Sequence, residues 1–130
     1  MSVRIGFPPV ERILTVRILI TVKPRMYREA IAISIHRHRP DSEIMLAPPE
    51  SLDGEMRRFR PHLVVRNDTD GTSPDTLASL AYQVKVLYSD GLDAEVSLNG
   101  QSRMEQDMSM DDLLQIIDEA QGLIPAEPTE

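Results

Sequence analysis

The stretch Arg17–Ile31, RILITVKPRMYREAI, decides the fold that this sequence predicts. It starts with a short aliphatic and β-branched run, Ile18–Val22, whose lack of alternation is typical of a strand covered on both faces. Lys23-Pro24 ends the run, because proline lacks an amide donor and disfavours helical angles in the preceding residue. Apolar residues then recur at helical spacing from Met26 to Ile35. We therefore expect the first half of a βαβ unit, with functional loops at the carboxyl ends of parallel strands.

The length of 130 residues predicts one domain with a real core. We expect an N-terminal arm over residues 1–15, an α/β domain over 16–124 and a flexible tail over 125–130. The chain has no cysteine, which excludes disulfides and thiol chemistry. No apolar run approaches the roughly 20 residues of a membrane span, and the N-terminus lacks a signal-like apolar core. These features predict a cytoplasmic protein without a membrane partner.

The charge is distributed unevenly along the chain. The net charge is −7, but residues 1–66 carry twelve Lys/Arg against seven Asp/Glu, whereas residues 67–130 carry two against fourteen. Opposite charges in the two halves favour contacts within one chain or between two copies, although a merely solvated surface is the simpler interpretation. The overall acidity disfavours non-specific binding to nucleic acid.

The rest of the chain continues the alternation of strands and helices. The patterns predict a helix over 25–38, a strand over 43–47, a short helix over 52–59, a strand over 63–65, a helix over 75–81, an antiparallel hairpin of 84–88 with 94–98, and a last helix over 110–120. We expect Ser51, Ser73 and Ser109 to cap the three later helices. This order predicts a three-layer α/β sandwich with a mainly parallel sheet.

Two segments resemble the receiver domain of bacterial response regulators. The run from Val22 to Glu29, VKPRMYRE, matches the segment after the family's first strand, and Pro61–Asn67, PHLVVRN, matches its third strand. The resemblance covers about residues 16–70 well and 109–122 loosely. It implies a flavodoxin-like fold, in which the C-terminal antiparallel hairpin here replaces the usual region of the fourth helix.

The positions that carry phosphorylation in this family are altered. The resemblance places the two metal-binding carboxylates at Val22 and Lys23, although magnesium prefers oxygen ligands. It places the phosphoryl acceptor at Asn67, with Asp68 one position along, and the switch Ser/Thr at Ser89. The family's lysine after the fifth strand has no equivalent here. We therefore expect a degenerate phosphorylation pocket without metal, cofactor or catalytic residues. One hypothesis pairs Lys23 with Asp68 or Asp90 in place of the metal, whereas a solvated lysine is the simpler interpretation.

The resemblance implies a pseudo-receiver that acts through protein–protein contacts in signalling or transcriptional regulation and is not an enzyme. We expect a protein partner, with a homodimer favoured. The candidate interface is the last helix, through Met110, Leu113, Leu114 and Ile117, together with the outer edge of the hairpin, which could pair with a second copy.

Two other classes of function stay open at this point. A small-ligand-binding domain or enzyme would use the crevice at the carboxyl ends of the first and third strands, with Lys23, Asn67, Asp68 and Ser89 as its polar groups. A nucleic-acid module would need a basic face formed by Arg57, Arg58, Arg60 and Arg66, and nucleic acid is the less expected partner.

Overall fold

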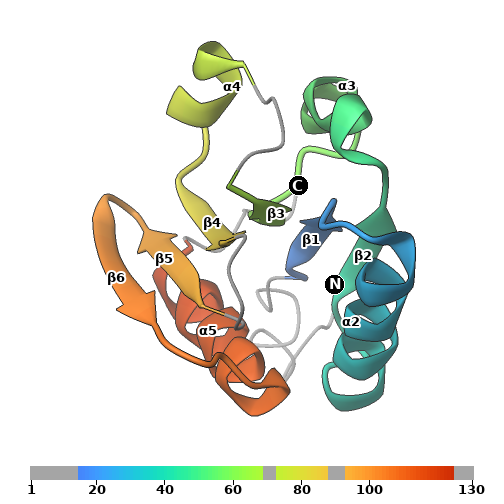
Figure 1. Cartoon of the computed structure of the whole chain (residues 1–130), viewed down its shortest axis with the longest axis vertical. Coiled ribbons are helices and arrows are strands. Elements are labelled where there is room, and N and C mark those ends of the chain that lie inside the picture. Colours follow the sequence, from blue (N-terminus) through green and yellow to red (C-terminus); the bar gives the residue numbers. More distant parts are fainter. Residues whose placement is uncertain (1–14, 69–72, 88–92, 125–130) are drawn as a thin grey trace, which may run out of the picture.

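The computed structural model describes residues 15–68, 73–87 and 93–124 (Figure 1). Its elements, in chain order, are β1 (Arg17–Ile20), α2 (Arg25–His38), β2 (Glu43–Leu46), η1 (Pro49–Ser51), α3 (Leu52–Arg58), β3 (Leu63–Asn67), α4 (Pro74–Ala78), β4 (Tyr82–Val86), β5 (Ala94–Leu98), β6 (Gln101–Glu105) and α5 (Met110–Leu123). The predicted arm lies outside this description apart from Thr15, and the predicted tail lies outside it entirely. No helix in the described ranges is long and apolar enough to cross a bilayer.

The six strands form one mixed sheet in the order β2-β1-β3-β4-β5-β6. Neighbours from β2 to β4 pair in parallel, whereas β4 with β5 and β5 with β6 pair antiparallel. The predicted flavodoxin-like sandwich with a mainly parallel sheet is therefore wrong, because the C-terminal end of the sheet is antiparallel throughout. The predicted hairpin is present within this end, with Val84 opposite Val96.

Short connections explain why the sheet changes direction. Residues 87–93 are too few for the crossover that a parallel strand after β4 would require. Asn99 and Gly100 then join β5 to β6 with φ angles of 53° and 90°, the left-handed pair that a tight hairpin turn favours. The sequence patterns did not predict the strand after this turn, because β6 is polar and largely exposed and lacks the alternation of a half-buried strand.

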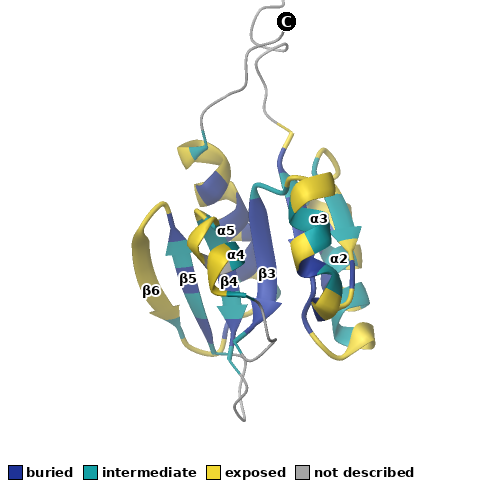
Figure 2. Ribbon diagram, turned by 90° about the horizontal axis from the view of Figure 1, so that it is seen from above, coloured by how far each residue is buried: buried dark blue, intermediate teal, exposed yellow. Residues whose placement is uncertain are grey.

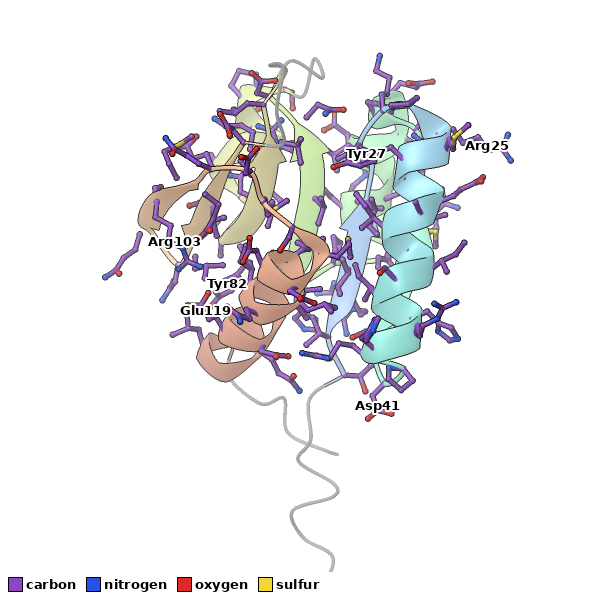
Figure 3. The ribbon with its side chains drawn as sticks, turned by 60° about the horizontal axis from the view of Figure 1, so that its bottom comes forward. Arg25, Tyr27, Asp41, Tyr82, Arg103 and Glu119 are labelled. Atoms are coloured by element: carbon purple, nitrogen blue, oxygen red, sulfur yellow. The ribbon has the colours of Figure 1, made fainter. Side chains whose placement is uncertain are left out.

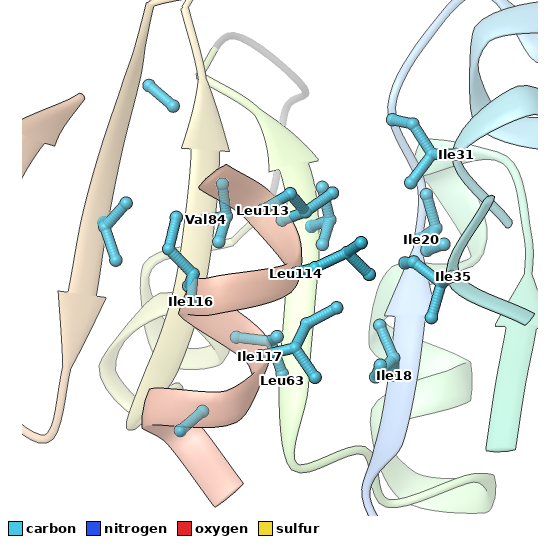
Figure 4. Packing of buried hydrophobic residues seen from close by; sticks show 14 of the residues in the cluster. Ile18, Ile20, Ile31, Ile35, Leu63, Val84, Leu113, Leu114, Ile116 and Ile117 are labelled. Carbon is cyan, nitrogen blue, oxygen red and sulfur yellow. The ribbon is translucent and has the colours of Figure 1, made fainter. Parts of the chain in front are cut away.

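The helices cover the two faces of the sheet (Figures 1 and 2). The larger core lies beneath α2 and α5, where Ile31 and Ile35 from one helix and Ile117 from the other pack against the strands (Figure 4). A smaller cluster on the opposite face packs Leu52 of α3 against Leu19 and Val64. Aliphatic residues at strand and helix spacing thus form an α/β/α arrangement around a mixed sheet.

Two of the three expected serine caps carry hydrogen bonds. Ser109 begins α5 with a complete capping box, because its hydroxyl accepts from the N–H of Asp112 and the Asp112 carboxylate accepts from the N–H of Ser109. The Ser73 hydroxyl accepts from the N–H of Thr76 at the start of α4. Ser51 occupies the capping position of α3 without a side-chain hydrogen bond, since η1 precedes the helix directly.

Candidate functional site

The residues predicted to line the degenerate pocket gather where β1 and β3 end. Val22 follows β1 and is fully buried in the larger core, while Lys23 next to it is exposed. Asn67 ends β3 with 3 % of its surface exposed, and Asp68 beside it is half-buried. The structure thus brings Lys23 and Asn67 together, whereas Ser89 and Asp90 lie outside the described residues.

The Asn67 side chain binds the backbone of the loop after β1. Its Oδ1 accepts a hydrogen bond of 2.7 Å from the N–H of Lys23. Leu63 and Val65 of β3 belong to the larger core, so alternation along the strand points Asn67 to the same face, towards α2. An amide side chain therefore joins the ends of two neighbouring strands.

Helix α2 holds the other side of the same loop. The Arg28 guanidinium donates from Nη1 to the Val22 carbonyl oxygen at 3.3 Å, and the N–H groups of Tyr27 and Arg28 donate to the Pro24 carbonyl oxygen. Lys23-Pro24 is a cis peptide bond. Partial burial raises the pKa of the Tyr27 phenol, so this side chain stays protonated at neutral pH and is not poised to act as a base.

Lys23 does not form the ion pair with Asp68 that the sequence suggested. Its side chain projects into solvent, and no described residue forms an ion pair with its ammonium group. The structure also contains no cluster of three or more His, Cys, Asp or Glu side chains suited to a metal ion within the described ranges. At this end of the sheet, the Asn67 side chain therefore holds the loop backbone by a hydrogen bond, and the Lys23 ammonium group beside it is solvated.

Arg66 lies on the opposite face of the sheet and is 4 % exposed. Its guanidinium donates to Gln83 Oε1 at 3.1 Å and to the Asn67 carbonyl oxygen at 2.7 Å, so it joins β3 to β4. The basic face that a nucleic-acid module would need is consequently incomplete, because Arg57 and Arg58 are exposed on α3 while Arg66 is inside. No sequence signal marked this burial, since an arginine at a strand end is ordinarily solvated.

The predicted interface on the last helix is occupied by the protein's own core. Leu113, Leu114 and Ile117 of α5 pack against the sheet (Figure 4), and Met110 is half-buried beside them. These side chains are not a surface of the folded chain. The outer edge of the predicted hairpin is also covered, because β5 pairs with β6 along its whole length.

Three hollows formed by described residues lie away from the end of β1 and β3. One is formed by α5 with β5 and β6, beside the ion pair between Arg103 and Glu119 (Figure 3). A second lies where the end of α2 meets the loop before β2. The third, of about 650 Å³, runs between α2 and β2. Neither Lys23 nor Asn67 lines any of the three.

The chain matches no protein-family model, no curated protein and no solved structure. The resemblance to receiver domains therefore stays a prediction from the sequence.

Proposed function

We propose that this chain is a phosphorylation-incompetent, receiver-like protein–protein interaction module of bacterial signalling or transcriptional regulation. In this proposal it works in the cytoplasm, binds a protein partner and performs no catalysis of its own. The support comes from the end of β1 and β3, where Val22, Lys23 and Asn67 occupy the positions that the resemblance assigns to the phosphorylation residues.

The hydrogen bond from the Lys23 N–H to Asn67 Oδ1 carries this proposal. In the receiver family that the sequence resembles, the acceptor is a carboxylate whose oxygen must be free to attack the donor, next to a magnesium ion held by further carboxylates. Here the acceptor position offers an amide oxygen that is already used by the backbone. The adjacent positions offer a buried aliphatic side chain, Val22, and a cation, Lys23. All three differences argue against phosphorylation at this end of the sheet.

The test is intact-mass spectrometry after incubation with acetyl phosphate and Mg²⁺. We expect no mass gain for the native chain, and none for Asn67→Asp, since Val22 and Lys23 still provide no ligand for magnesium. A gain of one phosphoryl group on the native chain would refute the proposal. A gain on Asn67→Asp alone would show that the cation site is intact and would refute the argument from Val22 and Lys23.

A small-ligand site at the same end of the sheet has less support. Its polar groups would be Lys23, Asn67 and Asp68, yet the Asn67 amide is bound to the loop, and none of the three hollows described above includes these residues. A panel of nucleotides and metabolites in a thermal-shift assay tests this alternative, because a ligand that binds the folded state raises the melting temperature.

A further inference from the structure

Exposed apolar side chains concentrate on the side of the molecule formed by α2 and β2. Met26, Ile33 and Leu46 are three of the five large hydrophobic residues that the described ranges expose, with exposures of 78 %, 61 % and 37 %. Ile33, Ile44 and Leu46 are among the residues that line the groove of about 650 Å³ between the helix and the strand. Apolar side chains gathered in this way mark a surface that another molecule covers.

The strand in this groove is an edge of the sheet. Only β1 pairs with β2 among the described strands. The N–H groups of Glu43 and Ala47 donate to the Val16 and Ile20 carbonyl oxygens, at 2.9 Å and 3.2 Å, and therefore point towards β1. Successive residues of a strand alternate in direction, so the N–H and C=O groups of Ile44 and Leu46 point outward. They form a template for one more strand.

We propose that two copies of this chain associate through antiparallel pairing of their β2 edges, with a two-fold axis at Met45. This inference rests on the proposed function, which requires a contact surface, and deepens it by naming the surface and the partner. The sheet would continue from one copy into the other, with both α2 helices on one face.

The register of this pairing is self-complementary. A two-fold axis at Met45 sets Ile44 of one copy opposite Leu46 of the other, and each of these residues offers an outward N–H and C=O. The two pairs can therefore exchange four backbone hydrogen bonds. Residues directly opposite in an antiparallel pair have their side chains on the same face, so these four aliphatic side chains form one cluster beneath the two Ile33 side chains. An isologous contact of this kind closes on itself and gives a dimer.

The charges on α2 agree with the same symmetry. Glu29 and Arg37 lie four residues before and four residues after Ile33. Two α2 helices related by an axis beside Ile33 run in opposite directions, which brings Glu29 of each copy to the level of Arg37 of the other. Arg37 is exposed, and Glu29 is half-buried in an ion pair of 2.8 Å with Arg25. The helix therefore presents opposite charges at the positions that the axis relates.

The other edge of the sheet lacks these features. Its strand, β6, is polar and largely exposed, and its central residue Arg103 is engaged by Glu105 and Glu119 of the same chain. A two-fold axis through this strand would bring the two Arg103 side chains close together. Such charges at an edge strand ordinarily prevent strand addition.

The first test measures the mass of the full-length chain by light scattering, up to roughly millimolar concentration, where even a weak contact populates the dimer. We expect about twice the 14.7 kDa of one chain. Ile33→Glu and Leu46→Glu should each weaken association at least tenfold, because they place two carboxylates in the apolar cluster. Met104→Glu is the matched control on β6, where the residue is 53 % exposed, and should leave the mass unchanged. Circular dichroism verifies that each variant is folded.

The second test uses the absence of cysteine from the native chain. The axis makes Met45 face its own copy in a non-hydrogen-bonded pair, with a Cα–Cα separation of about 4.5 Å that a disulfide can bridge. Met45→Cys should therefore form a covalent dimer with oxidised glutathione. Leu46→Cys is expected not to cross-link, since the two Leu46 residues lie on opposite sides of the axis, and Met104→Cys is the control on β6.

Three results would overturn the inference. The first is a single-chain mass at millimolar concentration. The second is a dimer that Met104→Glu disrupts and Leu46→Glu does not. The third is cross-linking of Leu46→Cys in preference to Met45→Cys. None of them depends on phosphoryl transfer, so a failure here is distinguishable from a failure of the proposed function.

Discussion

Asn67 has a structural role that its position in the sequence did not suggest. Its side chain is almost fully buried, and its Oδ1 is the acceptor for the N–H of Lys23. A buried polar group is tolerated when it is hydrogen-bonded, and this hydrogen bond also fixes the loop that links β1 to α2. Asn67 thus supplies a hydrogen-bonded contact between the ends of β1 and β3.

Asn67→Ala removes the acceptor and leaves the Lys23 N–H without its partner. We expect the free energy of unfolding to fall by about 1–3 kcal/mol, the cost of leaving a partly buried donor unsatisfied. Urea denaturation measures the change. Gln101→Ala, which truncates an exposed amide on β6, serves as the control and should change stability by less than about 0.5 kcal/mol. Equal effects of the two substitutions would contradict the role given to Asn67.

The Thr21 hydroxyl, unlike the Asn67 amide oxygen, is buried without a hydrogen bond to any part of the chain that the structure describes. Thr21 is fully buried, and its Oγ1 has no hydrogen-bond partner among the described residues. Thr21→Val keeps the branched shape and removes the unsatisfied polar atom, so we expect stability to rise by about 1 kcal/mol. The same substitution at Thr76 should destabilise, because the Thr76 hydroxyl bonds to Asp53 and to Ser73. A loss of stability in Thr21→Val would mean that this hydroxyl has a partner.

At the scale of elements, α2 and α5 are joined at the surface as well as through the core. Arg39, directly after α2, donates from Nε and Nη2 to the two carboxylate oxygens of Asp118 on α5, at 2.8 Å and 2.7 Å. The hydrogen bonds and charge of Arg39 lower the pKa of Asp118. A bidentate ion pair of this kind restrains the relative orientation of the two helices as well as the distance between them.

Asp118→Asn tests this ion pair through its dependence on pH. The folded-state pKa of Asp118 lies below the usual 3.8, so the pair stabilises the protein above that pH and loses its effect as the pH falls through the folded-state value. Both side chains are substantially exposed, which limits the difference between native and variant proteins to about 0.5 kcal/mol near neutrality. Denaturation curves from pH 7 down to about pH 2 should show the difference disappear. A difference that grows on acidification would exclude the ion pair as its cause.

At the scale of the whole molecule, one core joins the parallel and antiparallel parts of the sheet. Ile18 and Leu63 from the parallel part and Val84 and Val96 from the hairpin belong to one buried cluster with α5 (Figure 4). The helix packs across the change of strand direction, so the two parts are expected to unfold together.

Ile117→Ala tests this coupling, because Ile117 is 1 % exposed at the centre of the shared cluster. We expect a loss of about 2–5 kcal/mol from a total of roughly 5–15 kcal/mol. Urea unfolding followed by fluorescence and by circular dichroism should give coincident curves with a lower midpoint. Leu123→Ala, on the same helix with half its surface exposed, is the control and should have little effect. Two separate transitions would show that the hairpin and the parallel strands are independent units.

The local elements were largely predictable, since their signals are local. The strand β1, the helix α2 and the helix α5 with its Ser109 cap follow from aliphatic runs, helical spacing and capping chemistry between near neighbours. The hairpin followed from two alternating runs across a short turn. Strand β6 was missed because its stability comes from pairing with β5, and a polar edge strand has no periodicity of its own.

The sequence by itself determined which side chains stand at the ends of the first and third strands: an aliphatic Val22, a cationic Lys23 and an amide Asn67. Only the tertiary structure decided where the apolar surface lies. Helical spacing alone grouped Met26 with the buried Ile31 and Ile35. The helical pattern of the last helix likewise led to the prediction that Leu113 and Ile117 contact a partner protein. In the folded chain, the apolar face of α5 is buried against the sheet, whereas Met26, Ile33 and Leu46 are exposed on the side formed by α2 and the edge strand β2. Burial depends on which elements become neighbours, and a pattern within one element does not contain that information.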